Sequence, residues 1–364
     1  MTKEKILEAL STVQEPDLGR DLVTLNMVQD IVIEKFYVSF TIVLTTPACP
    51  LKDKLKNDCI NAIKTMVSKD AVVKVNFTSN TTTKRSDSGA ILPKVKNVIA
   101  VVSGKGGVGK STVSANLALA IAESGAKVGL MDADIYGPSV PIMFGVRGER
   151  PMMMEIEGKG MIVPLEKYGI KLMSIGLLVD EKNAVVWRGP MASSAIKQFV
   201  SDVYWDELDY LIIDMPPGTG DIHLTLMQTV PVTGAVIVTT PQDVALADAK
   251  KGVAMFGQAQ LNVPIIGLVE NMSYFTPAEL PENKYYIFGK DGGKRLAEEY
   301  DLPFLGQIPL VQGIREGGDK GVPVMVGNDE ITKKAFEDFA ALVVRSVSMR
   351  NADMVTEKVA EVVS

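Results

Sequence analysis

The sequence predicts an α/β protein in which a mostly parallel sheet is flanked by helices and preceded by a small α/β domain. Three observations support this fold class. Short apolar segments alternate with helical stretches between residues 97 and 307, a pattern typical of parallel sheets. A glycine-rich segment, 104–112, connects the first of these apolar segments to a helix. A polar segment without periodicity separates this region from the first eighty residues.

The N-terminal region has the pattern of a domain of its own. Helical periodicity and strand-like alternation predict elements at 3–13 (helix), 27–35 (strand), 36–44 (strand), 51–67 (helix) and 71–77 (strand). Residues 76–96 are then rich in Thr, Ser and Asn, as in a flexible linker. We therefore predict a small α/β domain at 1–80 and a linker at 81–95.

The larger domain is predicted at 96–350. Its strands are expected at 97–102, 127–131, 170–175, 209–214, 234–240, 264–270 and 303–307. A helix is expected directly after the glycine-rich segment, at 111–123, and another at 331–348, followed by a tail at 351–364 with a weaker helical pattern. Ligands of such sheets bind beyond the carboxyl ends of the strands, and here those ends carry polar and Gly/Pro-rich motifs.

The composition argues against several classes of function. The chain has 364 residues, of which 46% are hydrophobic, and a formal net charge of -6. This charge offers no basic stripe to a phosphate backbone, so we expect no nucleic-acid partner. No apolar run approaches the roughly eighteen residues that span a bilayer, and Met1 to Lys5 open a helix rather than a secretory signal. We therefore expect no membrane partner and a cytoplasmic location.

Two cysteines and one histidine limit the chemistry of metal binding. Cys49 and Cys59 fit a reducing compartment without disulfides. Cys49 precedes a predicted helix, where the helix dipole favours the thiolate and suits metal ligation; a small buried cysteine is the alternative. Cys59 is expected in the core. Because His223 is the sole histidine, the chain cannot form a His-rich metal site. The helical pattern around His223 predicts a helix-face residue rather than a catalyst.

Residues 104–112 read Gly-Lys-Gly-Gly-Val-Gly-Lys-Ser-Thr, which predicts a phosphate-binding loop. Glycines let backbone N–H groups surround the phosphates, the final lysine reaches the β and γ oxygens, and the next hydroxyl ligates magnesium. The expected fold is therefore a P-loop NTPase, with ATP and Mg²⁺ as cofactors. The predicted nucleotide-binding residues of the loop are Gly104, Lys105, Gly106, Gly107, Val108, Gly109, Lys110, Ser111 and Thr112. Lys105 is surplus to a single nucleotide site.

Acidic and amide side chains follow other strands of the predicted sheet. Asp132 and Asp134 come just after a strand, where one carboxylate can hold magnesium's water shell and the other can orient an attacking water; a solvated aspartate turn is the alternative. Asp214 and the Pro-Pro-Gly after it resemble a Walker B acid and a switch II, in which the Gly218 amide can sense the γ-phosphate. Asn271 ends a further strand, and its amide suits the adenine edge; a turn former is the alternative.

Five motifs occur in a characteristic order along the chain. They are the glycine-rich loop, Asp-Ala-Asp-Ile-Tyr-Gly-Pro-Ser, Trp-Arg-Gly-Pro-Met (187–191), Asp-Met-Pro-Pro-Gly-Thr-Gly-Asp and Glu-Asn-Met-Ser-Tyr-Phe. In this order they resemble the Mrp/ApbC family of iron-sulfur cluster carrier ATPases, whose phosphate loop is a deviant Walker A motif. The first eighty residues, with Thr-Thr-Pro-Ala-Cys-Pro, resemble the small domain often fused to these ATPases. The resemblance implies a slow ATPase that delivers clusters to apoproteins and works with assembly factors.

The resemblance also implies roles for single residues. Lys105 would reach across a two-fold axis to the partner subunit's nucleotide, so we expect a homodimer. Asp132 is assigned to the water molecules around magnesium and Asp134 to the orientation of the attacking water. The expected catalytic residues are thus Lys105, Lys110 and Asp134. The expected magnesium ligands are Ser111, Asp132 and Asp214, partly through water.

One part of the family pattern is missing. The family usually carries Cys-x-x-Cys shortly after Glu-Asn-Met-Ser, and these cysteines fall about where Pro277 and Leu280 stand. We therefore expect a carrier in which Cys49 of each subunit ligates a labile iron-sulfur cluster. The alternatives are an ATP-driven scaffold or chaperone that never holds a cluster, and a positioning ATPase of the chromosome-partition or division-site type.

Overall fold

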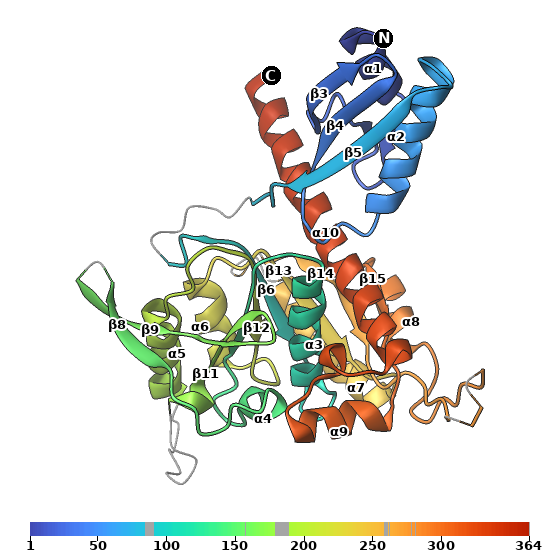
Figure 1. Ribbon diagram of the computed structural model, residues 1–364. Coiled ribbons are helices and arrows are strands. Elements are labelled where there is room, and N and C mark those ends of the chain that lie inside the picture. The colour runs from blue at the N-terminus through green and yellow to red at the C-terminus, as the bar shows by residue number, and fades with distance from the viewer. Residues whose placement is uncertain are drawn as a thin grey trace. The chain divides into compact units, whose positions relative to one another are not determined.

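The computed structural model describes residues 1–364 except 84–90, 157, 179–188, 258–260, 262, 278, 281 and 364. The side chains of 189, 190, 193, 221 and 353–363 also lie outside the description. The chain forms two units, and each is described by itself (Figure 1). The smaller unit comprises Met1–Thr83 and Val347–Ser364, and the larger unit comprises Lys84–Ser346.

The smaller unit is an α/β unit with a three-stranded sheet of order β3-β4-β5. Its elements are α1 (Lys3–Leu10), β1 (Gln14–Glu15), β2 (Arg20–Asp21), β3 (Val28–Glu34), β4 (Tyr37–Leu44), α2 (Lys52–Met66) and β5 (Val72–Ser79). Strand β4 is antiparallel to β3 and parallel to β5. Alternate residues of β4, from Val38 to Leu44, are buried, as expected for a strand with one covered face. Cys59 on α2 is fully buried in the same core, which confirms its predicted place.

Helix α10 (Glu330–Val363) differs from the expected C-terminal pattern of a helix at 331–348 and a separate weaker one. A single helix forms because no Gly or Pro interrupts the sequence between Ile331 and Val363. Asn351 is 1% exposed, and its Nδ2 donates a hydrogen bond to the Thr82 carbonyl at 3.0 Å. The described residues from Val347 onward therefore belong to the smaller unit.

The larger unit is built on an eight-stranded sheet of order β10-β11-β7-β12-β6-β13-β14-β15. The strands are β6 (Val95–Val102), β7 (Val128–Asp132), β10 (Leu165–Lys167), β11 (Ile170–Ser174), β12 (Leu208–Asp214), β13 (Gly234–Thr239), β14 (Ile265–Glu270) and β15 (Phe304–Gln307). Every neighbouring pair is parallel except β10 and β11. The expected strands all occur, which confirms the predicted fold class, and β10 is an additional edge strand.

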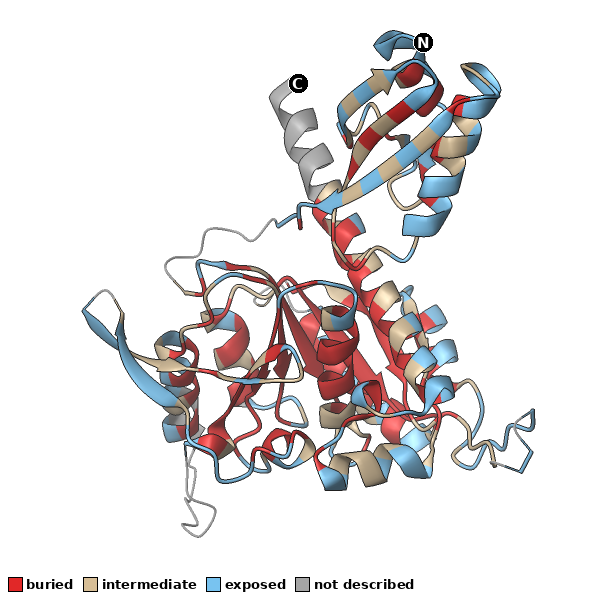
Figure 2. Ribbon diagram, in the orientation of Figure 1, coloured by how far each residue is buried: buried red, intermediate tan, exposed pale blue. Residues whose placement is uncertain are grey.

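Helices cover both faces of this sheet. They are α3 (Lys110–Glu123), α4 (Val140–Met143), α5 (Gly189–Asp202), α6 (Asp221–Thr229), α7 (Asp243–Phe256), α8 (Gly292–Glu299) and α9 (Gln312–Lys320). Helices α5 to α8 share one core with Val98 and Ala100 of β6. The intervening Ile99 and Val101 are fully buried too, and α3 contacts β7 and β12. Figure 2 shows buried residues concentrated on the strands of this sheet and on the helices against it. The central strand β6 is therefore buried on both faces from Asn97 to Val102, as expected for a parallel strand between two helical layers.

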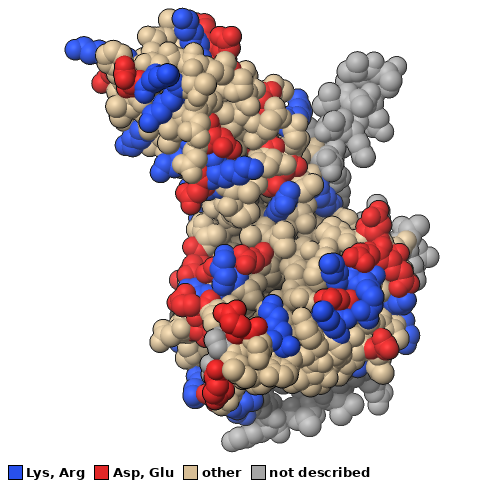
Figure 3. Space-filling model, turned by 90° about the vertical axis from the view of Figure 1, so that its right-hand side faces the viewer, with Lys and Arg blue, Asp and Glu red and all other residues tan. Residues whose placement is uncertain are grey.

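The surface carries charges of both signs. On the face drawn in Figure 3, Lys and Arg side chains lie among Asp and Glu side chains. This mixture accords with the small negative net charge of the chain. None of the helices in the described part of the chain is long and apolar enough to cross a membrane.

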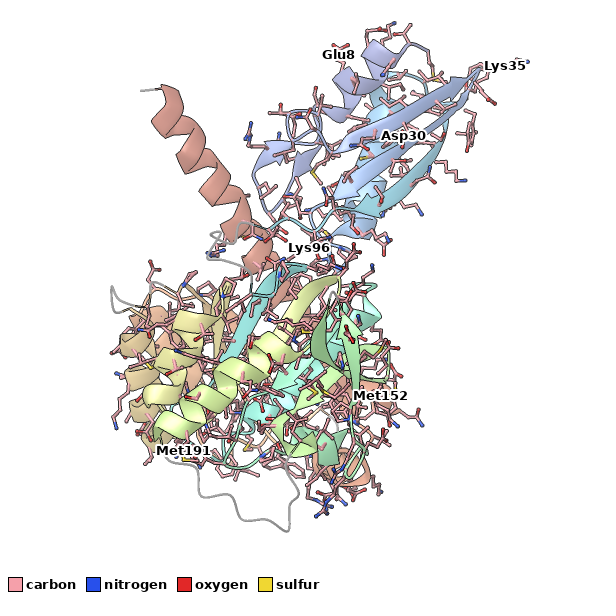
Figure 4. The ribbon with its side chains drawn as sticks, turned by 90° about the vertical axis from the view of Figure 1, so that its left-hand side faces the viewer. Glu8, Asp30, Lys35, Lys96, Met152 and Met191 are labelled. Carbon is pink, nitrogen blue, oxygen red and sulfur yellow. The ribbon has the colours of Figure 1, made fainter. Side chains whose placement is uncertain are left out.

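A two-stranded hairpin of the larger unit was not expected from the sequence. Strands β8 (Met152–Ile156) and β9 (Lys159–Val163) pair antiparallel and lie outside the eight-stranded sheet. Met152, Met153 and Met154 are all exposed, and Figure 4 labels Met152 on β8. Three consecutive methionines show no alternation between apolar and polar residues, so the period of a half-buried strand is missing from the sequence.

Candidate nucleotide-binding site

The loop between β6 and α3 has a backbone that glycine alone tolerates at several points. Gly107 and Gly109 have φ angles of 84° and 79°, in the left-handed region that disfavours other residues. A side chain at Gly104 would overlap the backbone of Asp248 on α7, and one at Gly109 would overlap the amide of Asn271. The loop therefore turns tightly against two neighbouring elements. Its backbone leads directly into the N-terminus of α3 at Lys110, where N–H groups are free to bind an anion.

Lys110 and Asp214 form a buried ion pair beside this loop. The distance from Lys110 Nζ to Asp214 Oδ1 is 2.6 Å, and the two side chains are 6% and 0% exposed. Lys110 also donates a hydrogen bond to Ser111 Oγ at 3.2 Å, and Ser114 Oγ donates to Asp214 Oδ1 at 2.8 Å. The structure thus brings the predicted lysine, hydroxyl and Walker B acid together at one point. The sequence analysis missed Ser114, although it lies one helical turn after Lys110 and so faces the same way.

One carboxylate oxygen of Asp214 remains available to accept a hydrogen bond beside Lys110 and Ser111. Its Oδ2 is buried and has no hydrogen-bond partner among the described residues. A buried carboxylate oxygen without a partner is costly, and a hydrated divalent cation supplies both charge and O–H donors. Within the described part of the chain, no group of three or more His, Cys, Asp or Glu side chains could hold a metal ion. This donor set fits Mg²⁺, which takes one or two protein ligands and completes its shell with water and phosphate oxygens.

Asp132 is held rigidly at the end of β7. Its Oδ2 accepts hydrogen bonds from Ser174 Oγ at 2.9 Å and from the Val140 amide at 3.3 Å, and its Oδ1 accepts one from the Asp134 amide at 3.1 Å. Complete burial and the neighbouring Asp214 raise the pKa of Asp132 to about 7. The Lys110 ammonium and the Ser174 hydroxyl oppose this rise. Asp132 is therefore a hydrogen-bond acceptor in a fixed position, and its protonation depends on the charges of Asp214 and Lys110.

Asp134 lies at the edge of the same cluster. It is 8% exposed, and its Oδ1 accepts hydrogen bonds from the amides of Tyr136 and Gly137, both at 3.2 Å. Burial raises the pKa of this carboxyl, the Lys110 charge lowers it, and the Asp214 charge raises it. One of its oxygens is thus committed to the turn that follows β7. The structure brings Asp134 into electrostatic range of the predicted magnesium site, as the spacing of the two acids indicated.

Gly218, the predicted phosphate sensor, is hydrogen-bonded to the residue just before the phosphate loop. Its amide donates a hydrogen bond to the Ser103 carbonyl at 2.9 Å, and its φ angle is 96°. The Met215 amide donates to the Val101 carbonyl at 3.1 Å. The segment after β12 is therefore fixed to β6 and to Ser103, which connects β6 to the phosphate loop.

A cavity of about 390 Å³ opens beside the phosphate loop. It is lined by Gly109, Thr112, Ser139, Ile142, Met143, Asn271, Met272, Pro309, Leu310, Val311, Ile314, Arg315, Gly318 and Asp319. Mostly apolar walls next to the N-terminus of α3 suit a planar base attached to a bound phosphate chain. Asn271, predicted to contact the adenine edge, lines this cavity, and one of its N–H groups is already used: Nδ2 donates to the Val108 carbonyl at 2.8 Å. Contact between Asn271 and the base stays a prediction, for which Oδ1 is an available acceptor.

Lys105 differs from Lys110 in its surroundings. It is half-buried on the phosphate loop, and its side chain has no ion pair with any described residue. Lys105 is thus not held in the cluster that Lys110 and Asp214 form.

Cys49 lies in the smaller unit, in the loop before α2, and is half-buried. Burial raises the pKa of the Cys49 thiol, the Leu51 amide lowers it, and the charges of Glu15 and Asp17 raise it further. The expectation that the helix dipole favours the thiolate was wrong, because burial and two carboxylates outweigh the α2 N-terminus. Pro277 and Leu280 lie in a loop closed by two hydrogen bonds between Phe275 and Tyr285, each 2.8 Å long, and offer no thiolate.

The Trp-Arg-Gly-Pro-Met motif and His223 were also singled out in the sequence. Trp187 and Arg188 of the Trp-Arg-Gly-Pro-Met motif lie outside the described residues. His223 lies on α6, as predicted, and is 1% exposed. Sequence reasoning gave it no partner, although its position two residues into α6 and just after the Pro-Pro-Gly segment was visible in the sequence.

The chain was compared with known protein families and relatives. Residues 94–344 match the family described as NUBPL iron-transfer P-loop NTPase, and residues 3–77 match the family described as iron-sulfur cluster assembly protein. A Synechocystis relative named iron-sulfur cluster carrier protein is 48% identical over 351 residues, which cover 96% of this chain and 99% of that protein. A relative of the same name from Escherichia coli (strain K12) is 44% identical over 321 residues, covering 88% of this chain and 85% of that protein.

Solved structures show the same fold for the larger unit. A nucleotide-binding protein from Archaeoglobus fulgidus, solved in complex with ADP, is 37% identical, with a TM-score of 0.57 over 68% of this chain and 96% of that one. The cell division ATPase MinD of Pyrococcus furiosus is 24% identical, with a TM-score of 0.50 over 68% of this chain and 98% of that one. The second likeness supports the fold alone.

Proposed function

Because the chain belongs to the NUBPL iron-transfer family of P-loop NTPases, we propose that it hydrolyses ATP and delivers iron-sulfur clusters to apoproteins. The relatives named iron-sulfur cluster carrier protein support the second half of this proposal, as does the N-terminal match to an iron-sulfur cluster assembly family. The observation that carries the ATPase half is the buried contact of Lys110 with Asp214 beside a glycine-rich loop. The two reduced cysteines further support a cytoplasmic setting.

Nucleotide binding follows from the charges of this cluster. The amides at the N-terminus of α3 receive the phosphates, and Lys110, whose ammonium has three N–H donors and donates to Ser111 and Asp214, has one donor left for a phosphate oxygen. The Lys110 charge is then shared between Asp214 and the phosphates, so the buried Asp214 is less fully neutralised. Ser111, and through water Asp132 and Asp214, would hold Mg²⁺, which supplies positive charge to the phosphates when bound. Binding of the phosphates and of the metal is coupled for this reason.

Hydrolysis depends on groups that border the cluster. Asp134 is fixed by the amides of Tyr136 and Gly137 and keeps an oxygen to orient a water molecule. Lys105 lies on the phosphate loop outside the Lys110 cluster, and we assign it to the nucleotide of a partner subunit in a homodimer. Turnover is slow in this scheme, because the site is complete only when two subunits meet. Removal of the Lys110 amine by Lys110→Met tests the scheme, since ATP binding and hydrolysis should then both be lost.

The cluster itself is cargo, and Cys49 is the residue we assign to it. The sequence offers two thiols per subunit, and Cys59 is fully buried in the core. Cys49 is half-buried and within electrostatic range of Glu15 and Asp17. Its raised pKa favours the thiol over the thiolate at neutral pH, which fits a ligand that binds iron weakly and releases it. Two subunits would each supply one Cys49, and an acceptor protein or a small thiol would complete the ligation.

Anaerobic iron-sulfur reconstitution of the wild type and Cys49→Ser tests this assignment. Iron and sulfide per dimer and the visible absorption are measured for both, with Cys59→Ser as the matched control for loss of a thiol. We expect a cluster in the wild type and in Cys59→Ser but not in Cys49→Ser. Equal iron binding by the wild type and Cys49→Ser would refute the assignment.

A second function is favoured by one specific observation. Pro277 and Leu280 stand where the family usually has its cysteines, and the loop that contains them carries no thiol. An ATP-driven scaffold that docks apoproteins without holding a cluster needs no such ligands. Absence of cluster in all three reconstituted proteins, together with stable capture of an apoprotein, would favour the scaffold.

A further inference from the structure

His223 is the sole histidine of the chain, and it is buried beneath the segment that follows β12. Its Nε2 lies 2.8 Å from the Pro216 carbonyl oxygen. A carbonyl oxygen can only accept a hydrogen bond, so Nε2 carries the proton and donates it. Proline has no N–H group, and the carbonyl is therefore the one backbone polar group that Pro216 offers. The imidazole thus fixes this residue of the segment by its main chain.

The segment from Met215 to Gly220 is held at three points. The Met215 amide is bonded to Val101 on β6, the Pro216 carbonyl to His223 on α6, and the Gly218 amide to the Ser103 carbonyl. A γ-phosphate would break one of these three hydrogen bonds and leave the other two in place. The Gly218 amide can turn to a phosphate oxygen only by leaving Ser103. The other two bonds can persist while Gly218 moves, so Pro216 is the last fixed residue before the part that must reorient.

Burial keeps the imidazole in the form that this contact needs. Burial lowers the pKa of His223, and the Lys110 charge lowers it too, whereas the hydrogen bond to the Pro216 carbonyl and the nearby Gly220 backbone raise it. The ring is therefore neutral at pH 7, with one donor nitrogen and one acceptor nitrogen. The donor is the nitrogen on Pro216, and Nδ1 has no hydrogen-bond partner among the described residues. Its one strong contact is thus with the segment after Asp214.

We propose that His223 is a positioning residue for ATP hydrolysis: its bond to Pro216 fixes the pivot about which Gly218 turns from Ser103 to the γ-phosphate. The inference rests on the ATPase activity proposed above. His223 touches neither nucleotide nor metal, and it acts through Pro216 on Gly218. Loss of the His223 hydrogen bond should lower the fraction of time that Gly218 spends at the γ-phosphate. The affinity for ADP should stay unchanged, because ADP has no γ-phosphate.

Two substitutions separate this bond from a general packing role. Gln carries its amide nitrogen about as far from the backbone as imidazole Nε2, whereas Asn carries its amide only about as far as Nδ1. His223→Gln can therefore keep the donor for Pro216, and His223→Asn cannot. We expect kcat to fall about fivefold in His223→Asn, the equivalent of one hydrogen bond, and by less than about twofold in His223→Gln. The Kd for a fluorescent ADP analogue should stay within about twofold in both variants.

Thermal unfolding and amide hydrogen exchange of 215–220 are measured on the same full-length proteins. Exchange at these amides should be faster in His223→Asn than in His223→Gln. Equal kcat values in the two variants, or parallel losses of kcat and ADP affinity, would overturn the inference. If the wild type hydrolyses no ATP, the proposed function fails instead, and the exchange comparison alone then decides whether His223 fixes the segment.

Discussion

Asp132→Asn should change the pH dependence of stability more than stability itself. Asp132 is fully buried at the end of β7, next to Asp214 and the Lys110 ammonium. Asparagine has nearly the same shape but cannot ionise. One of its atoms is a donor where Asp132 has an acceptor, so the substitution weakens either the contacts with Ser174 and Val140 or the contact with the Asp134 amide. The free energy lost with these hydrogen bonds is the same at every pH. The contribution of Asp132 ionisation to the free energy of unfolding, in contrast, changes with pH.

The magnitude follows from the difference between the folded and unfolded pKa. Burial and Asp214 raise the pKa of Asp132 from 3.8 to about 7. The folded protein therefore binds more protons than the unfolded chain between about pH 4 and about pH 7. The stability that this carboxyl contributes is present at low pH and is lost as the pH rises through this window. From about pH 5 to about pH 8 the wild type loses about 3 kcal/mol that Asp132→Asn does not lose.

Urea unfolding at about pH 5 and about pH 8 measures this difference. Tryptophan fluorescence reports on the larger unit, because both tryptophans, Trp187 and Trp205, lie between residues 84 and 346. Nucleotide and Mg²⁺ are omitted, so that their binding adds no pH dependence of its own. Asp301→Asn, at an exposed position of the larger unit after α8, serves as the matched control. A stability difference between wild type and Asp132→Asn that is the same at both pH values would refute the reasoning.

Three further predictions concern single residues. Lys105→Ala should lower the ATPase rate more than the affinity for ATP, and equal losses in the two assays would contradict a role across the dimer. Gly109→Ala should lower the free energy of unfolding by about 2 kcal/mol or more, because its φ is 79° and the added methyl overlaps Asn271; Gly106→Ala, with open space around it, should cost much less. Because burial raises the pKa of Cys49, alkylation by iodoacetamide should be slow near pH 8 and accelerate above about pH 9; the rate of an exposed thiol near pH 8 would contradict this.

The residues of the phosphate site could be predicted because their chemistry is local. The glycines of 104–109 are required by the turn itself, and Lys110 and Ser111 act from the first turn of the next helix. Asp132 and Asp214 end adjacent parallel strands, and such ends meet at one edge of a sheet. The strands that carry them were predicted from periodicity, whereas their adjacency is known from the structure alone.

Contacts between distant segments could not be predicted in the same way. The raised pKa of Cys49 depends on burial and on Glu15 and Asp17, about thirty residues earlier in the chain. Local sequence shows the helix N-terminus after Cys49 but not the carboxylates that oppose its effect. The contact of His223 with Pro216 spans only seven residues, but it depends on the angle at which α6 leaves the loop, which local sequence does not show. Sequence periodicity predicts that a helix forms, whereas the orientation of that helix is set by tertiary packing.

The amide of Asn271 joins the phosphate loop to the cavity beside it. The same side chain borders this cavity and holds the Val108 carbonyl of the loop, and it leaves no space for a residue larger than glycine at 109. A substitution of Asn271 would therefore alter the wall of the cavity and release the loop at the same time. On our prediction that Asn271 contacts the base, discrimination among bases and strength of phosphate binding are coupled through this one side chain.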